Sequence, residues 1–442
     1  MRIYTLLIFI LFSATAFSQK QTATYLQQFK FRTPNFRSVL FSGNANGAFN
    51  TPNGSATSPQ FALNPKLEAT KIVSTDKVLA SYTYQVSAAF NHNSATIATG
   101  VQSNTNFDYS IIQSASKKLY KQANYFQTGF STLVKQSFAN STNNFTERGK
   151  AAFSSIAFTI GVGKGRIENV TDAQMAYNIL NDLKKNNLLA ADFSKQDVNG
   201  LAQTITQLNN TRLFDFRRKH IFELKQIDSF LNAKGLVKEK SIDYFTTVND
   251  NWFYAFNELR RHGKEKFITL SPSIGLNNTK SVFNILPVDS TTKYFSKFAG
   301  AILSIGVEKA KALSIKKQFN KGLSLLTIYG YSKNKTTFNS LINQTTNSNI
   351  FSGLLGYLQW GYYPNTRTNI NTTVSNLLVW QIENDAINNN TSINFSGNYF
   401  INFNTRVFVN VSSNLNINRS FNTDFNAAAT ASFGFGIQHY IR

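Results

Sequence analysis

The feature that most constrains the fold of this chain is a strict alternation of apolar and polar residues over long segments. In residues 406–418, for example, Val407, Val409 and Val411 alternate with Asn410 and Ser412. A period of two puts successive side chains on opposite faces of a β-strand. Segments of ten or more residues with this pattern recur about fourteen times, which is typical of strands that span a membrane.

The segments fall into two groups separated by a different pattern. We predict strands at 35–48, 59–73, 77–92, 104–119, 122–138, 147–163, 265–282, 291–308, 314–333, 349–363, 366–383, 391–402, 405–418 and 424–441. The gaps between them alternate between long and short, and the longest is the polar Asn334–Ser348. Membrane barrels have short periplasmic turns, longer external loops and both chain ends inside. This parity places the segment after the sixth strand in the periplasm.

That intervening segment, Thr171–Gly263, has the 3.6-residue period of about four amphipathic helices. Thr171 and Gln174 have the spacing of a capping box, and further helices are expected to start at Ser194 and near Ser241. Gly235 is expected to end the third helix. The last helix is expected to close at Arg260, Arg261 and His262 before Gly263, where cations favour the helix dipole. Of the 22 acidic residues, 13 lie between Lys164 and Lys266, as expected for a water-exposed domain.

The N-terminus has the pattern of a secretory signal peptide. Arg2 precedes the apolar run Ile3–Phe12, and Ala16-Phe17-Ser18 resembles a cleavage site. No later stretch approaches the 18 consecutive apolar residues of a transmembrane helix. The chain has no cysteine, which excludes disulfides, thiolate metal sites and cysteine nucleophiles.

We therefore predict a mainly β protein: a transmembrane antiparallel up-and-down β-barrel of about 14 strands, range 12–16, with an inserted periplasmic α-helical domain. The expected domains are a signal peptide (1–18), a patternless periplasmic lead-in (19–34), barrel strands (35–163), the helical insert (164–263) and further barrel strands (264–442). The alternative is a soluble two-sheet sandwich. The barrel is favoured because the strands are long and aromatic residues gather near strand ends, as at Trp360, Tyr362 and Tyr363.

On these grounds the chain resembles outer-membrane β-barrel proteins of Gram-negative bacteria, particularly the Asn- and Phe-rich type from Bacteroidota. The resemblance lies in the signal peptide, the strand pattern and the turn alternation, and it matches no particular porin family. It implies an outer-membrane location, contact with membrane lipid and insertion by the barrel-assembly machinery. One departure is the end Tyr440-Ile441-Arg442, because such barrels often end in an aromatic residue.

Catalytic patterns are weak. His92, with Asp108 on the next expected strand, is the one histidine near an expected outer loop, so a rim hydrolase is a third class of function. The run Gly161–Gly165 lacks the ending of a phosphate-binding loop and is interpreted as a flexible exit from the sixth strand. We expect no enzyme activity, no cofactor and no metal site.

Cationic residues give the remaining candidate sites. Arg217, Arg218 and Lys219 form a basic run on the third helix, available for anion or partner contact. Two groups at expected periplasmic turns suggest lipid contact at that rim: Lys117, Lys118, Lys121, Lys309, Lys311, Lys316 and Lys317. An exported chain without a recognisable module is not expected to bind nucleic acid.

The leading functional hypothesis is a non-enzymatic, porin-like channel for small solutes, based on inward faces rich in Asn, Ser and Gly. The alternative is a structural or assembly component whose periplasmic helical domain binds a partner protein or a cell-wall polymer.

Overall fold

The architecture is that of a computed structural model, which describes most of the chain. The described residues are 23–50, 58–97, 100–142, 146–210, 216–254, 259–285, 288–339, 341–381, 386–402, 405–420 and 423–439. The expected signal peptide and the chain end at Tyr440–Arg442 lie outside them.

The β-part is one antiparallel sheet in which each strand pairs with its neighbours in sequence order. The strands are β1 Thr33–Asn50, β2 Ser58–Ser74, β3 Val78–Ile97, β4 Gly100–Lys121, β5 Asn124–Thr142, β6 Thr146–Asn169, β7 Arg261–Ile285, β8 Val288–Ala312, β9 Lys317–Phe338, β10 Leu341–Asn365, β11 Thr368–Gln381, β12 Ala386–Asn402, β13 Thr405–Ser420 and β14 Thr423–His439. The predicted strand number and up-and-down order are confirmed. Within the described residues, the recorded pairings run from β1 to β14 without one that joins these two edges.

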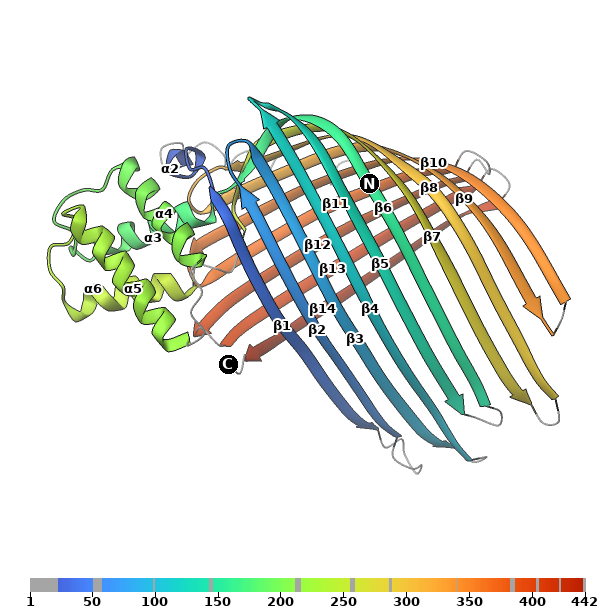
Figure 1. Ribbon diagram of the computed structural model, residues 1–442. Helices are drawn as coiled ribbons and strands as arrows, with labels where there is room; N and C mark the ends of the chain where they lie inside the picture. The colour runs from blue at the N-terminus through green and yellow to red at the C-terminus, as the bar shows by residue number, and fades with distance from the viewer. Residues whose placement is uncertain are drawn as a thin grey trace.

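Twelve of the fourteen strands are longer than predicted, and β11 and β14 are shorter. β7, β8 and β10 each have 25 residues, which at about 3.4 Å per residue is a length of about 85 Å. A strand needs only about ten residues to cross a membrane. Figure 1 shows the strands running between two ends of the molecule, with the helices gathered at one of them, here called the helical end. The opposite end is called the far end.

The sheet is strongly curved, and in Figure 1 its first strands cross over its last ones. Near the end of β6, Arg166 donates hydrogen bonds to Ser74 Oγ (2.7 Å) and to Thr75 O (2.6 Å), which lie at the end of β2. In a flat sheet, the four strand spacings between β2 and β6 would amount to about 19 Å. One arginine side chain cannot cover that distance, so the ends of these strands approach by bending of the sheet.

The connections between strands are short at both ends, so the predicted alternation of long and short gaps is wrong. The predicted gap Asn334–Ser348 is largely strand, because β9 continues to Phe338 and pairs there with Leu341 of β10. Residues 341–348 are all exposed, and a strand with water on both faces has no reason to keep an apolar alternation. The count of strands still places the helical segment at the end expected from it. The turns after β2, β4, β8, β10 and β12 lie at the same end as the segment after β6.

Four helices occupy the segment between β6 and β7, as predicted: α3 Thr171–Lys185, α4 Lys195–Asn209, α5 Phe216–Ala233 and α6 Ile242–Tyr254. Ser194 caps α4 through a capping box with Asp197, and Gly235 follows α5 with φ +65°. Ser241 Oγ accepts a hydrogen bond from Tyr244 N before α6. These start and stop signals are confirmed.

The expected capping box of Thr171 and Gln174 is wrong. Val170 is the N-cap of α3, and it makes no side-chain capping bond. Thr171 Oγ1 instead accepts a hydrogen bond from Arg260 N (2.9 Å), and Gln174 Oε1 accepts one from Arg260 Nη1 (2.8 Å). Both side chains therefore accept hydrogen bonds from Arg260, which lies nearly ninety residues away in the sequence, and neither caps the helix.

The predicted end of the last helix is also wrong. Arg261, His262 and Gly263 belong to β7, which pairs with β6 as far as Asn169. Residues 164–169, expected in the helical insert, are accordingly strand. Pairing of two strands satisfies the backbone groups of both chains at once, whereas a longer α6 would satisfy only its own.

The run Gly161–Gly165 is part of β6 and pairs with β7, so it is not a flexible exit. A Cβ atom on Gly163 would lie 2.3 Å from the ring of Tyr125, and Gly165 has a φ of +96°. The glycines therefore allow close packing within the wall of the sheet.

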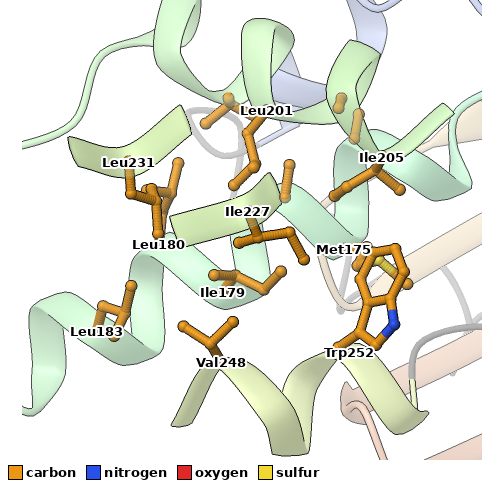
Figure 2. Packing of buried hydrophobic residues seen from close by; sticks show 14 of the residues in the cluster. Met175, Ile179, Leu180, Leu183, Leu201, Ile205, Ile227, Leu231, Val248 and Trp252 are labelled. Carbon is orange, nitrogen blue, oxygen red and sulfur yellow. The ribbon is translucent and has the colours of Figure 1, made fainter. Parts of the chain in front are cut away.

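The helices share a hydrophobic core. Figure 2 shows side chains from α3, α4, α5 and α6 directed toward one another. The core includes Met175, Ile179, Leu180, Leu183, Leu201, Ile205, Ile227, Leu231, Val248 and Trp252. Full burial of one such side chain contributes about 1.5–3 kcal/mol, so this cluster is sufficient to hold the helices together.

A fifth helix, α2 (Ala23–Gln27), lies in the lead-in for which we predicted no structure. Leu26 and Phe29 are buried in the same core as the other helices, and the Tyr25 ring lies 5.2 Å from that of Tyr177. A helix of five residues is too short to show a period, and its apolar partners are about 150 residues away. The local pattern could not reveal it.

Candidate functional site

The sheet has two chemically different faces. On β13, Val407, Val409 and Val411 lie on one face, whereas Ser412 and Asn414 lie on the other and pair in register with Asn394 and Ser392 of β12. The same separation continues across the neighbouring strands. We call the two sides the apolar face and the polar face.

The apolar face is open to its surroundings along the whole sheet. Many of its large side chains are between about two fifths and three quarters exposed; examples are Phe158, Ile160 and Val162 on β6, Leu323 and Leu325 on β9, and Phe433 and Phe435 on β14. Soluble monomers rarely expose connected apolar patches larger than a few hundred Å². An apolar face of this extent is typical of a surface that lipid or another protein covers.

The polar face is concave. A hollow of about 680 Å³ spans β1 to β5 on this face. Its wall includes a row of residues that lie directly opposite one another in register: Ser42, Lys66, Ser87, Ser110 and Lys135. Small hydroxyl side chains leave room between the two lysines, so the hollow is suited to water and small polar solutes.

The charges on the polar face are largely paired. Lys66 Nζ lies 2.8 Å from Glu68 Oε2, and Asp108 lines the same hollow. Within the described residues, no ion pair is recorded for Asp108 or for Lys135. These two side chains are therefore the charged groups of the hollow that a passing ion would meet unpaired.

Larger side chains narrow the polar face toward the helical end. Lys118 Nζ and Tyr125 Oη both donate hydrogen bonds to Glu265, which is buried. Nearby, Arg261 Nη1 lies 2.9 Å from Glu308 Oε1, and Tyr357 Oη donates to the same oxygen at 2.6 Å. Each carboxylate thus holds a cation and a phenol together. These clusters project from β4, β5, β7, β8 and β10.

Arg260 connects the helices to the sheet. Its side chain is fully buried and donates hydrogen bonds to Gln174, Gln318 and the backbone oxygens of the β8–β9 turn, at Ser314, Ile315 and Lys317. Its guanidinium lies 4.6 Å from the centre of the Tyr363 ring. Burial lowers the pKa of Arg260 to about 10, so it remains charged at neutral pH.

Three further contacts attach the helices to other strand ends. Asp250 of α6 pairs with Arg367 in the β10–β11 turn. Asn210 after α4 donates a hydrogen bond to Thr33 Oγ1 at the start of β1 (2.8 Å). Gln27 of α2 donates to Ala312 O at the end of β8 (3.2 Å). The helical domain is thus fixed to several separate points of the same rim.

The basic residues predicted to contact an anion, a partner or lipid form only part of the expected groups. Arg217 and Arg218 are exposed on α5, whereas Lys219 lies 3.7 Å from Glu223 of the same helix. Of the lysines expected at the rim, Lys118 is turned to the polar face, where it pairs with Glu265, and Lys317 is partly buried at the start of β9. The others are exposed at the helical end: Lys117, Lys121, Lys309, Lys311 and Lys316.

Sequence reasoning missed the groups that define this end. Glu265 and Glu308 gave no motif, because each obtains its partners from strands that only the register brings near. Arg260 was predicted only as a cation at the end of the last helix, and its acceptors lie on α3 and around the β8–β9 turn. His92 Nδ1 lies 2.8 Å from Thr105 Oγ1, its directly opposite neighbour on β4, and not beside Asp108. Tyr363, expected at a lipid-facing girdle, is buried against Arg260 and Asn371, whereas the rings of Trp360 and Tyr362 stack at 5.9 Å.

Comparisons with known proteins give distant similarities. No protein-family model and no curated protein matches the sequence. Among solved structures, the chain is similar to the ferric yersiniabactin uptake receptor FyuA from Yersinia pestis, with 5% identity, a TM-score of 0.38, and coverage of 90% of this chain but only 63% of the receptor. It is also similar to the P. putida toluene transporter TodX (8% identity, TM-score 0.30, 95% and 94% covered) and to OmpT of Vibrio cholerae (9%, 0.20, 84% and 100%). These similarities are too distant for any functional conclusion to depend on them.

Proposed function

We propose that this chain is an outer-membrane β-barrel that forms a passive channel for small polar solutes, with its helical domain on the periplasmic side. The observation that carries the proposal is the exposed apolar face that accompanies a concave polar face. In such a barrel, lipid covers the apolar face and a water-filled lumen lies against the polar face. The asparagine-rich inner face agrees with the resemblance to barrels of the Bacteroidota type.

A membrane location also requires the sheet to close. An open strand edge in hydrocarbon leaves backbone N–H and C=O groups without partners, at a cost of several kcal/mol for each group. In the proposed barrel, β1 and β14 therefore pair with each other. About fourteen strands enclose a lumen wider than the smallest, side-chain-filled barrels.

The test is conductance in planar lipid bilayers. We expect the purified full-length chain to give a small, ohmic conductance, because the helical domain is attached across one end. Replacing residues 170–260 by Asn-Gly should enlarge it, since Asn169 and Arg261 are directly opposite in register and a two-residue turn can join them.

Charge substitutions then connect the current to the polar face. Lys135→Glu, in the hollow, should shift the reversal potential in a KCl gradient toward cation selectivity. Lys117→Glu, an equally simple change at an exposed position outside the hollow, should leave it unchanged. Absence of current from both the full-length and the shortened chain would refute the channel.

A second function has one observation in its favour. On α6, Ile242 is 81% exposed and Phe245 is 44% exposed, so the helical domain presents an apolar surface to solution. A protein that conducts in neither form would be assigned to partner binding through this domain.

A further inference from the structure

Lysines are aligned across neighbouring strands at the far end of the sheet. Lys150 of β6 lies directly opposite Lys280 of β7, which lies directly opposite Lys293 of β8. Closer to the middle of the sheet, Lys297 of β8 lies directly opposite Lys333 of β9. Lys335 lies opposite Phe295, between these two rows. We call these six residues the far-end lysines.

All six far-end lysines are exposed, and all belong to the apolar face. On β8, Lys293 and Lys297 share their face with Leu303 and Ile305, and on β9, Lys333 shares its face with Leu323 and Leu325. The lysines therefore continue the lipid-facing surface and do not line the lumen.

Their height matches a membrane surface. At the helical end of the same face, Lys264, Lys309 and Lys321 form another directly opposed row. Lys321 and Lys333 are twelve positions apart on β9, which at about 3.4 Å per residue and a tilt of about 40° is a height of roughly 31 Å. An apolar band of about 25 Å fits between the row of Lys321 and that of Lys333, with both at headgroup level, and the row of Lys293 lies about 10 Å further out.

Aromatic rings accompany the cations at this level. Lys150 Nζ lies 5.4 Å from the centre of the Phe138 ring, and Lys297 Nζ lies 5.7 Å from that of Phe295. Tyr329 and Tyr331, which are exposed, precede Lys333 on β9. Rings of this kind mark the boundary between hydrocarbon and headgroups.

The far-end lysines have few anions near them. In the far halves of β6 to β9, acids occur within the described residues only at Glu147, which falls on the polar face, and at Asp289, four positions beyond Lys293. No ion pair is recorded for any of the six lysines in the described part of the chain. Like charges directly opposite one another destabilise a sheet, so this arrangement is favourable only with a polyanion from outside.

We propose that the far-end lysines bind the phosphate groups of a phosphorylated glycolipid headgroup, lipid A of the outer leaflet. The inference rests on the proposed function, which puts the far end at the cell surface. Several ammonium groups, spread over about 10 Å of height on four adjacent strands, form charge-assisted hydrogen bonds with a headgroup that carries more than one phosphate. The acyl chains of the same lipid cover the apolar face below.

Native mass spectrometry of the full-length protein in detergent, titrated with bis-phosphorylated lipid A, tests this. Lys150→Gln/Lys280→Gln/Lys293→Gln should weaken binding at least tenfold, and the same three positions changed to Arg should retain it. The control is Lys225→Gln/Lys234→Gln/Lys238→Gln, three exposed lysines of the helical domain, which lies away from the apolar face, and we expect less than a twofold change. Binding by the parent protein should also weaken as salt is raised, because exposed charges are screened.

Three results would overturn the proposal: equal binding by the far-end Gln variant, an equal loss in the control variant, or equal binding of lipid A from which the phosphates have been removed. Conductance separates this inference from the one on which it rests. Loss of lipid specificity with an intact current refutes only the lipid site. Intact lipid binding without current refutes only the channel.

Discussion

Trp252→Ala tests whether the helical domain is held by its own core. Trp252 is 3% exposed, and its Nε1 donates a hydrogen bond to Glu223 Oε2 at 2.9 Å. Loss of a buried tryptophan ring costs about 3–5 kcal/mol through lost burial and the cavity that remains. A whole domain is stable by only about 5–15 kcal/mol, so we expect most of the stability of the helical domain to disappear.

Two further variants divide this cost into its parts. Trp252→Phe keeps most of the apolar volume but removes the N–H donor to Glu223, which is itself buried. The loss of a hydrogen bond to a charged group corresponds to about 1.5–3 kcal/mol. Phe245→Ala is the matched control, because Phe245 lies on the same helix but is 44% exposed, and a surface change costs about 0.5 kcal/mol.

Pulse proteolysis of the full-length protein in detergent, across a urea series, measures these differences. Cleavage between residues 170 and 260 reports unfolding of the helical domain while the sheet stays intact. With a slope of about 1.5 kcal/mol per molar urea, Trp252→Ala should lower the midpoint by roughly 2–3 M. A midpoint for Trp252→Ala no lower than that of Phe245→Ala would refute the reasoning, because the ring would then not be part of a core that holds the helices.

The remaining predictions concern buried charges of the same domain. Arg260→Met leaves the oxygens of Gln174, Ser314 and Ile315 without their donor and should cost about 3–5 kcal/mol in the same assay, whereas Arg260→Lys should cost less. Burial raises the pKa of Asp172 to about 6, above its unfolded value of about 4, so the folded state favours the protonated acid. Stability from this group is full below about pH 4 and is lost as the pH rises through about 6; Asp172→Asn should remove this dependence, and a variant that keeps the parent pH profile would contradict the assignment.

The strand number and the helix starts could be predicted because their causes are local. A strand with lipid on one face and water on the other must alternate, and in the proposed barrel each strand meets that condition over part of its length. Ser194 with Asp197 and the positive φ of Gly235 likewise follow from a few adjacent residues. Strand length could not be predicted, since residues 341–348 have water on both faces and the alternation ends before the pairing does.

The candidate sites depend on register, which the sequence does not specify. Parity along a strand assigns Lys280 to a face, but only the pairing of β6, β7 and β8 puts it directly between Lys150 and Lys293. In the same way, Lys118 was predicted to contact lipid at the rim, but the pairing of the strands places it beside Glu265 of β7. Arg260 obtains all its acceptors from α3 and from the β8–β9 region, so no local pattern marks it as buried.

The attachments of the helical domain decide how a channel of this shape could conduct. Arg260 holds the domain at the β8–β9 turn, Asp250 at the β10–β11 turn and Asn210 at the start of β1. A swing of the whole domain away from the rim would have to break all three contacts, including the bonds of a fully buried guanidinium. Such a swing is costly, and solutes that use the lumen therefore pass beside a domain that stays in place. For this reason removal of residues 170–260 is expected to widen an existing path and not to create one.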